Sequence, residues 1–306
     1  MFKKLFNKKK RVVLAAENKP GKFSGTLGVF AAIMLALVVR SFWFEPFHIP
    51  SGSMFPGLAV GDYLFISKSR YGYSNHSFPF SPRLINGRVF ASAPERGDVI
   101  VFKKTKGRAE NYIKRLVGMP GEVIQVRGGV LHINGEAVGR EEAGRFWILS
   151  IPKRERGARR IDYMLEDGRR VSIERSRRVF IDGVQLAPSD FTLSFDNRGG
   201  AAIYAVRKYL ETLPNGVSYF ILKDRADADD YTEEFVVPAG HFFMMGDNRD
   251  DSTDSRFLDK VGFIAADELM GRAKFVMLSS RKSAAWWQVW SWPWAVRWER
   301  TGSGIR

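Results

Sequence analysis

Val130-Leu131-His132-Ile133 runs directly into Asn134-Gly135, and Asn-Gly after a short apolar run is a strong signal for a β-hairpin turn. Similar short segments, separated by Gly, Pro and Asn, recur on both sides: Tyr63–Ser67, Asp98–Phe102, Glu122–Val126, Tyr219–Leu222, Glu234–Val237, His241–Met245 and Gly271–Leu278. Outside the N-terminal region, helical periodicity over ten residues is best developed in Ala201–Leu210, where we expect a helix. The sequence therefore predicts a mainly β protein.

The apolar strand signals divide the chain into segments. Residues 139–232 are richer in charge and poorer in long apolar strands than their surroundings. We therefore expect a core formed by residues 45–138 and 233–280, with residues 139–232 as an inserted β-rich subdomain.

The N-terminal region has the pattern of a membrane anchor. Residues 1–22 are strongly basic, with a single acidic residue at Glu17, and Thr26–Val39 is apolar. The exit through Phe42-Trp43-Phe44 is too bulky for a small-x-small cleavage site, so an uncleaved transmembrane helix is expected over residues 23–44. The positive-inside bias places residues 1–22 in the cytoplasm and the rest outside. The alternative is a buried core helix.

Composition excludes several classes of site. The 306 residues contain no cysteine, and the four histidines lack paired metal-ligand spacing, so we expect no disulfide, metal or cofactor. The formal net charge is +15, but much of it lies in residues 1–22. The basic stretch Lys153–Arg178 is interleaved with acidic residues, which is typical of a solvated face or a surface meeting anionic lipid, not of a nucleic-acid groove.

The C-terminal segment, residues 281–306, is unusually rich in tryptophan. Trp286, Trp290, Trp294 and Trp298 recur at a spacing of four, although Pro293 interrupts any helix. Tryptophan favours the headgroup region of a bilayer, so this tail is expected to contact membrane lipid; the alternative is a tail packed on its own domain.

Two short segments can together form a serine hydrolase site. Ile49-Pro50-Ser51-Gly52-Ser53-Met54 offers a serine on a glycine-hinged turn, where the alternative is a linker. Tyr112-Ile113-Lys114-Arg115 offers a lysine among apolar neighbours, where the alternative is an exposed strand lysine. Burial, with Arg115 as a neighbouring like charge, would lower the pKa of Lys114 toward that of a general base.

A third segment, Gly246–Arg256, alternates arginines with carboxylates. A calcium loop or a solvated turn are the alternatives, but the acidic spacing does not fit an EF-hand. We expect an ion-paired scaffold whose serine steadies the lysine amine.

Taken together, these segments resemble the bacterial type I signal peptidases over about residues 26–280. The resemblance rests on four motifs in the family order: Pro-Ser-Gly-Ser-Met (50–54), Arg-Gly-Asp-Val-Ile-Val-Phe (96–102), Tyr-Ile-Lys-Arg-Leu-Val-Gly-Met-Pro-Gly (112–121), and Gly-Asp-Asn-Arg-Asp through Ser-Thr-Asp-Ser-Arg (246–256). It implies a β-barrel-like extracytoplasmic catalytic core tethered to the inner (cytoplasmic) membrane by one helix. The implied activity is removal of signal peptides from exported preproteins by a monomeric Ser–Lys dyad protease.

The resemblance also implies residue roles. Ser53 would be the nucleophile and Lys114 the general base, with Ser252 orienting the lysine. Ser51 and the Ser53 backbone N–H would form the oxyanion hole, and two further residues a supporting ion pair: Asp254 and Arg256. Shallow pockets for small substrate residues at −1 and −3 would be lined by apolar and aromatic side chains: Ile49, Met54, Leu58, Val101, Tyr112 and Ile113.

The sequence departs from the family pattern at Asp251, where asparagine is frequent. A carboxylate one residue from Ser252 would favour protonated Lys114 and raise the pH optimum. Other readings stay open. A pilus-maturation peptidase or self-cleaving repressor would use the same dyad, although a repressor needs a DNA-binding helix-turn-helix where this chain has its apolar span. An inactive membrane-tethered β binding module, or a basic nucleic-acid binder at the membrane surface, would not need the Ser–Lys dyad.

Overall fold

The computed structural model of the protein describes residues 27–35, 44–78, 86–107, 109–196, 200–280 and 296–305. In these residues strands dominate and the expectation of a mainly β protein is confirmed. Contacts along the chain divide it into two units, residues 1–40 and residues 41–306. All of the sheets belong to the second unit.

The described part of the first unit is a helix over residues 27–35. Within the described residues, none of the helices combines the length and the apolar character needed to cross a membrane. The basic tail expected at 1–22 and most of the anchor expected at 23–44 lie outside the described residues. Phe44, the last residue assigned to the anchor, begins the first strand of the second unit.

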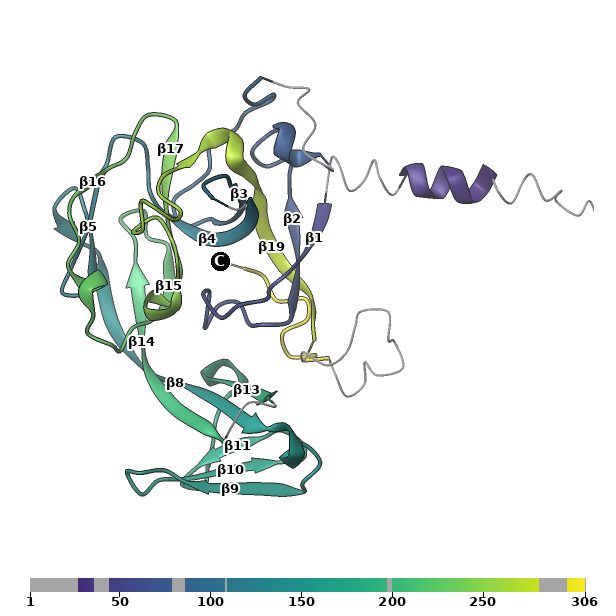
Figure 1. The fold of residues 1–306 in the computed structure, drawn as a ribbon, viewed down its shortest axis with the longest axis vertical. Helices are drawn as coiled ribbons and strands as arrows, with labels where there is room; N and C mark the ends of the chain where they lie inside the picture. The colour runs from purple at the N-terminus through teal and green to yellow at the C-terminus, as the bar shows by residue number, and fades with distance from the viewer. Residues whose placement is uncertain are drawn as a thin grey trace, which may run out of the picture. The chain divides into compact units, whose positions relative to one another are not determined.

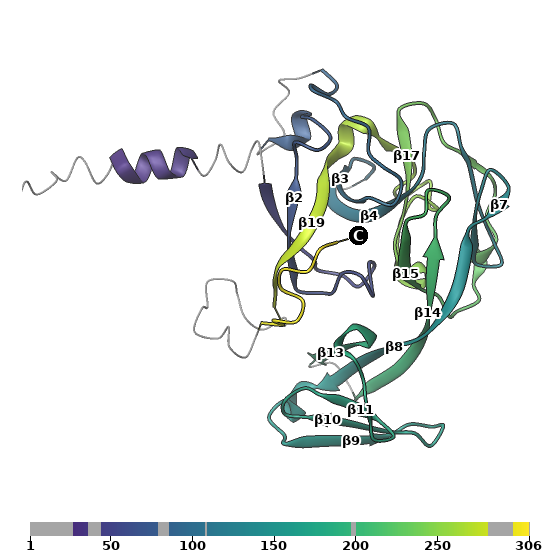
Figure 2. The same cartoon turned by 180° about the vertical axis from the view of Figure 1, so that it is seen from behind.

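The central sheet of the second unit is antiparallel throughout, in the order β1-β2-β19-β3-β4-β17-β18 (Figure 1). Its strands are β1 Phe44–His48, β2 Asp62–Ser67, β3 Val99–Lys104, β4 Glu110–Gly118, β17 His241–Met245, β18 Ile264–Ala265 and β19 Leu269–Ser279. Segments from both ends of the expected catalytic core therefore form one sheet. Seen from behind, β19 crosses the unit beside β2 and β3 (Figure 2).

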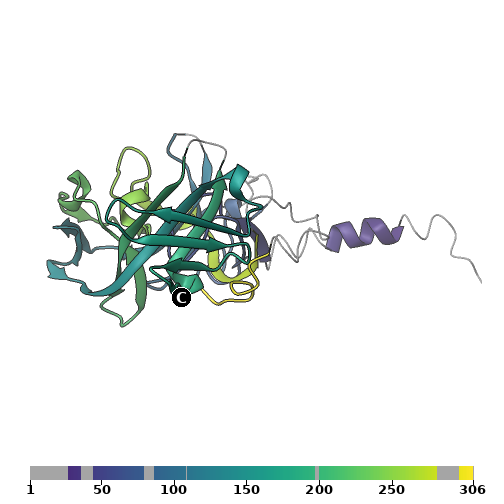
Figure 3. The ribbon, with the colours of Figure 1, turned by 90° about the horizontal axis from the view of Figure 1, so that it is seen from below.

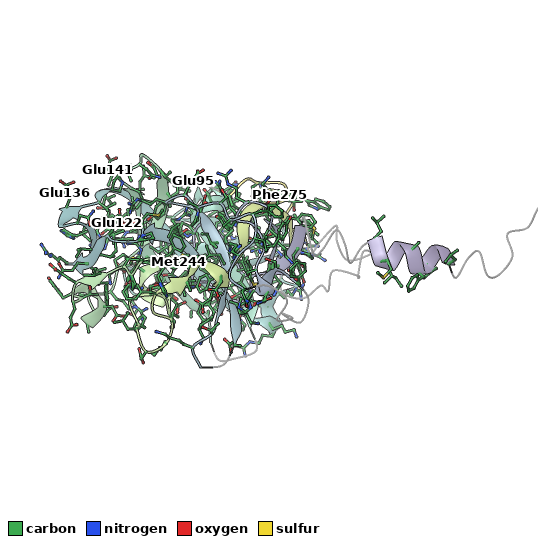
Figure 4. The ribbon with its side chains drawn as sticks, turned by 90° about the horizontal axis from the view of Figure 1, so that it is seen from above. Glu95, Glu122, Glu136, Glu141, Met244 and Phe275 are labelled. Atoms are coloured by element: carbon green, nitrogen blue, oxygen red, sulfur yellow. The ribbon has the colours of Figure 1, made fainter. Side chains whose placement is uncertain are left out.

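A smaller antiparallel sheet, in the order β16-β5-β6-β7, contains the predicted hairpin. Its strands are β5 Val123–Arg127, β6 Val130–Ile133, β7 Glu136–Ala137 and β16 Phe235–Val236. Asn134 and Gly135 both have positive φ angles, 54° and 83°, as a tight hairpin between β6 and β7 requires. Glu136, just after this turn, points outward at the periphery, whereas Met244 is fully buried (Figure 4).

Two further sheets are built wholly from residues 139–222, in the orders β13-β8-β14-β15 and β12-β11-β10-β9. Their strands are β8 Gly139–Pro152, β9 Arg160–Met164, β10 Arg170–Glu174, β11 Val179–Ile181, β12 Val184–Gln185, β13 Phe191–Asp196, β14 Ala202–Thr212 and β15 Ser218–Leu222. In the view from below, these teal and green strands lie across the unit (Figure 3).

The prediction of a helix at Ala201–Leu210 is wrong. Residues 202–210 belong to strand β14, which pairs antiparallel with β8 on one side and β15 on the other. Strand β8 spans 14 residues, so the scarcity of long apolar runs in this region does not mean that its strands are short. Pairing between distant segments decided the conformation here, because strand preference depends on context more than helix preference does.

Separate apolar clusters hold the sheets together. One lies within residues 147–205, around Trp147, Leu149 and Val171. A second joins the small sheet to the central sheet and also includes Tyr219 and Ile221 of β15. The segment 139–232 is therefore connected to the flanking core through packed side chains as well as through its two ends.

The described part of the tryptophan-rich tail, residues 296–305, packs on the central sheet. Val296 is buried and forms a β-bridge with Ser280, whereas Trp298 is 57% exposed. Trp286, Trp290 and Trp294 lie outside the described residues.

Candidate active site

Ser53 lies on a loop whose two ends are hydrogen-bonded to each other. At the ends, the Ile49 amide donates to the Asp62 carbonyl (2.8 Å), and the Gly61 amide donates to the Ile49 carbonyl (2.9 Å). Inside the loop, the Leu58 amide donates to the Met54 carbonyl (2.8 Å). We call residues 49–62 the catalytic loop. Its closure holds the Ser53 side chain, which is almost buried, in one place.

Two glycines allow the close approaches around Ser53. A Cβ at Gly52 would lie 2.4 Å from the ring of Phe55. A Cβ at Gly246 would lie 2.7 Å from the Ser53 carbonyl oxygen and 2.2 Å from Ser252 Oγ. A side chain at Gly246 would require the Ser53 backbone to move, and one at Gly52 would require the Phe55 ring to move.

Lys114 reaches the serine from β4, a strand paired on both sides, with β3 and with β17. Its Nζ lies 2.6 Å from Ser53 Oγ, and the side chain is 3% exposed. Nζ also lies 5.6 Å from the centre of the Tyr112 ring. The serine and lysine picked out from distant segments of the sequence are thus in hydrogen-bond contact in a buried site.

The surroundings make Lys114 a stronger candidate base. Burial lowers the pKa of Lys114 to about 8, and the carboxylates of Asp254, Asp247 and Asp251 oppose this, while Arg256 adds to it. A lysine with such a pKa is neutral in an appreciable fraction of molecules near neutral pH. The role given to Arg115 is wrong, because neighbouring residues on a strand point to opposite faces and Arg115 bonds Asp247 instead.

The two other serines are differently placed. Ser51 is exposed, and its Oγ is 3.5 Å from Ser53 Oγ. Ser252 is buried and its Oγ has no hydrogen-bond partner among the described residues, so its expected bond to the Lys114 amine is not formed in this structure. Its Oγ and the Ser53 carbonyl oxygen nevertheless lie close to the same α-carbon, because a Cβ added at Gly246 would be 2.2 Å from the first and 2.7 Å from the second.

Asp254 and Arg256 form a buried ion pair beside the site. Arg256 Nε donates to Asp254 Oδ1 (2.8 Å), and the other carboxylate oxygen accepts from the Gly246 amide (2.9 Å). Burial alone would raise the pKa of Asp254, but Arg256 and these hydrogen bonds hold it below the usual value. The pair thereby fixes the backbone at Gly246, which contacts Ser53.

The sequence as a whole matches one family. Residues 25–278 match the family described as signal peptidase, peptidase S26. The chain belongs to this family.

Individual relatives agree with this assignment. A signal peptidase I from Rickettsia prowazekii is 34% identical over 270 residues, which cover 85% of this chain and 81% of the relative. The enzyme of the same name from Rickettsia typhi is 35% identical over 265 residues, covering 83% and 79%. A crystal structure of a signal peptidase I from Enterococcus faecalis covers 59% of this chain and 97% of its own, with 20% identity and a TM-score of 0.27, too low to bear on the fold. The protein is therefore a serine peptidase of the signal peptidase family.

The apolar residues expected to line the substrate pockets of this peptidase fall into two groups. Five share one cluster, in which side chains of the catalytic loop pack against β3 and β4: Ile49, Met54, Leu58, Val101 and Ile113. Tyr112 packs instead against the neighbouring cluster around Phe102. The difference follows from strand geometry, because Tyr112 and Ile113 point to opposite faces of β4.

Sequence reasoning missed Asn248, which binds the catalytic loop directly. Its backbone amide donates to the Ser53 carbonyl (3.1 Å), and its Nδ2 donates to the Gly52 carbonyl (3.2 Å). The motif Gly-Asp-Asn-Arg-Asp pointed to this segment, but nothing in it pointed to a contact with residues 52 and 53.

A buried charge network was also missed. Arg115 makes two 2.8 Å bonds to Asp247 and stacks 3.9 Å from the centre of the Tyr219 ring. Tyr219 donates to Glu211 (2.5 Å), whose carboxylate also binds Arg249. Glu211 lies in β14 and Tyr219 in β15. Residues of the 139–232 segment therefore hold residues 247–249, of which Asn248 contacts Ser53.

Asp251 gives a pH-dependent prediction for this peptidase. Its carboxylate raises the pKa of Lys114, so Asp251→Asn should lower that pKa. If neutral Lys114 is required, activity increases as pH rises through the pKa, and the acid limb of kcat/KM should move to lower pH. The pH profile of signal-peptide cleavage measures this. Asp259→Asn, at an exposed carboxylate, is the matched control; an unmoved limb in Asp251→Asn would contradict the prediction.

Proposed function

We propose that this peptidase removes signal peptides from exported preproteins with Ser53 as nucleophile and Lys114 as general base. The observation that carries the proposal is the 2.6 Å contact between Ser53 Oγ and a buried lysine whose pKa is lowered to about 8. A serine hydroxyl is a weak nucleophile until an adjacent base takes its proton. Neutral Lys114 supplies that base without histidine.

The reaction follows from these two groups. Lys114 Nζ accepts the Ser53 proton as Oγ attacks the carbonyl carbon at −1, and the resulting ammonium gives this proton to the leaving amine. The signal peptide is left as an ester on Ser53. Water, deprotonated by Lys114, then attacks the ester and releases the peptide carboxylate and free serine.

The oxyanion of each tetrahedral intermediate needs hydrogen-bond donors. We assign the Ser53 backbone N–H and the Ser51 hydroxyl, whose Oγ is 3.5 Å from Ser53 Oγ. We assign Ser252 to orienting the lysine amine, since its buried hydroxyl contacts the same Gly246 backbone that touches Ser53. The Asp254–Arg256 pair supports this side of the site.

Ser51→Ala tests the oxyanion assignment. Removing one such donor costs about 10²–10³ in kcat, and we expect a loss of this size with a small change in KM. Steady-state kinetics on a preprotein substrate measure it. Ser69→Ala is the control, because Ser69 is exposed and faces Ser67 in a similar 3.4 Å serine pair. A loss below tenfold in Ser51→Ala would remove Ser51 from this role.

Selectivity is proposed to come from exclusion of large side chains. Ile49, Met54 and Leu58 of the catalytic loop form one apolar cluster with Val101 and Ile113, and Tyr112 lies on the opposite face of β4. Shallow sites formed on such a surface would accept alanine at −1 and −3 and reject larger residues. The extended substrate would bind as an added β-strand.

The proposed setting is the inner membrane, with one N-terminal anchor, residues 1–22 in the cytoplasm and the catalytic unit on the outer face. It rests on the basic 1–22 segment followed by the apolar run. Signal peptides of preproteins and membrane lipids are the expected partners of a monomeric enzyme that does not bind nucleic acid.

One experiment tests the reaction and its selectivity. The detergent-solubilised full-length protein is incubated with a preprotein carrying Ala at −3 and −1, and with a second carrying Phe at −1, and products are identified by mass. Cleavage after the −1 alanine, with the Phe substrate intact, is expected. Equal cleavage of both would overturn the selectivity, and no cleavage by the folded protein would overturn the function.

A further inference from the structure

The described end of the chain forms an arm on the central sheet. Residues 296–305, the C-terminal arm, run beside β19 (Figure 1, Figure 2). The Arg297 amide donates to the Ser279 carbonyl (2.7 Å), the Gly302 amide to the Val276 carbonyl (2.7 Å), and the Ile305 amide to the Lys274 carbonyl (2.9 Å). Backbone bonds along its length thus fix the arm to the sheet.

Two arginines of the arm converge on a single buried carboxylate. Asp62, the last residue of the catalytic loop, is 0% exposed. Arg300 Nη2 donates to Asp62 Oδ2 (2.7 Å), and Arg297 Nη2 donates to Asp62 Oδ1 (3.2 Å). Ala59 of the loop donates its amide to Asp62 Oδ2 as well (2.8 Å). A buried carboxylate with this many donors holds them in fixed positions.

The same guanidinium groups bind the backbone of the catalytic loop. Arg300 Nη2 donates to the Gly57 carbonyl (2.8 Å), and Arg297 Nη2 donates to the Val60 carbonyl (2.7 Å). Each arginine therefore bridges Asp62 to a loop carbonyl through Nη2. Its Nε binds a further oxygen at the same time: Asp62 Oδ1 for Arg300 (3.3 Å) and Ser279 Oγ for Arg297 (2.7 Å). This use of two nitrogens in a rigid guanidinium fork cannot be reproduced by the single nitrogen of an ammonium group. The loop is held from both sides: by Asn248 at residues 52 and 53, and by the arm at residues 57–62.

From these contacts we infer that Arg297 and Arg300 are positioning residues for catalysis, which fix the Ser53-bearing loop through Asp62, Gly57 and Val60. The inference rests on the proposed role of Ser53. Neither arginine touches the dyad; both act through the loop that carries it. Because a displacement of about 1 Å from a change remote from the chemistry can cost about 10²-fold in rate, loosening residues 57–62 should reduce catalysis.

The kinetic signature separates positioning from general destabilisation. Arg300→Met should lower kcat about 10- to 100-fold and change KM less than about threefold. The acid limb of the pH profile should stay where it is in wild type, because Arg300 is not among the charges that set the Lys114 pKa. Full-length wild type and variants are compared at a temperature where circular dichroism shows all of them folded.

Two further variants sharpen the test. Arg300→Lys keeps a charge for Asp62 but lacks the second nitrogen, Nε, with which Arg300 binds the other carboxylate oxygen, so its kcat should fall between wild type and Arg300→Met. Arg178→Met is the matched control: Arg178 and Arg300 line one cavity, but Arg178 pairs with Glu174 and not with the catalytic loop. It should retain wild-type kcat.

The outcomes are distinguishable from failure of the proposed function. If the wild-type protein does not cleave the preprotein, the proposed function of Ser53 as nucleophile is wrong. If wild type cleaves and Arg300→Met has unchanged kcat, or if Arg178→Met loses as much, the positioning role falls. If Arg300→Met does not fold, Arg300→Lys decides, and unchanged kcat in that variant overturns the role.

Discussion

Ser53→Ala should abolish preprotein cleavage, lowering kcat by about 10⁴-fold or more. The alanine lacks the hydroxyl oxygen that contacts Lys114 and would form the acyl ester. What activity remains would come from the oxyanion donors and substrate binding acting on water, as in other serine peptidases that have lost the nucleophile. Product mass after extended incubation with excess enzyme measures this residual rate.

The variant should stay folded. The backbone contact from Asn248 to the Ser53 carbonyl does not involve the hydroxyl, and the turn bonds of the loop are unaffected. The midpoint of thermal unfolding should therefore shift by no more than about 4 °C, the effect of about 1 kcal/mol in a chain of this size. A folded Ser53→Ala protein that still cleaves at the same bond would disprove the nucleophile assignment.

Lys114→Arg should be as inactive as Lys114→Ala, also at about 10⁴-fold or more below wild type. A guanidinium stays protonated at any pH at which the protein is folded, so it cannot accept the serine proton. The longer side chain also does not fit a site in which Lys114 is 3% exposed and already within 2.6 Å of Ser53 Oγ. Single-turnover cleavage at pH values from 7 to 10 measures the loss.

Lys104→Arg provides the control for this change. Lys104 lies on β3, and its Nζ is 5.2 Å from the centre of the same Tyr112 ring that Lys114 approaches at 5.6 Å. It is not in contact with Ser53 and should retain wild-type activity. Activity in Lys114→Arg above that of Lys114→Ala would exclude Lys114 as the general base.

The strands of the core could be predicted because their local signals agree with their final environment. The Asn134-Gly135 turn and the apolar runs at β3 and β17 need only nearby residues to be recognised. The strand at Ala201–Leu210 could not be predicted, because most of it pairs with β8, and β9 to β13 separate these two strands in the sequence. Periodicity in one segment contains no information about such partners.

The same division holds for the site. The family motifs pointed to Ser53 and Lys114, and these are the groups that the structure brings within 2.6 Å. The residues that hold them were not predictable. Asn248 binds the loop through its backbone amide, and Asp62 binds two arginines that follow it in the sequence by more than 230 residues. Such contacts exist only once the sheets are assembled.

The buried lysine also has a thermodynamic cost. Burial lowers the pKa of Lys114 from 10.5 to about 8. At a pH between these two pKa values, Lys114 is protonated in the unfolded chain but neutral in the native protein. Stability therefore rises with pH across this interval, and below it the native state carries a penalty of about 3 kcal/mol from this one side chain. Lys114→Met, which removes the charge and keeps the bulk, should then unfold at a higher temperature than wild type at pH 7. The burial that makes Lys114 a base near neutral pH therefore also lowers the thermal stability of the enzyme.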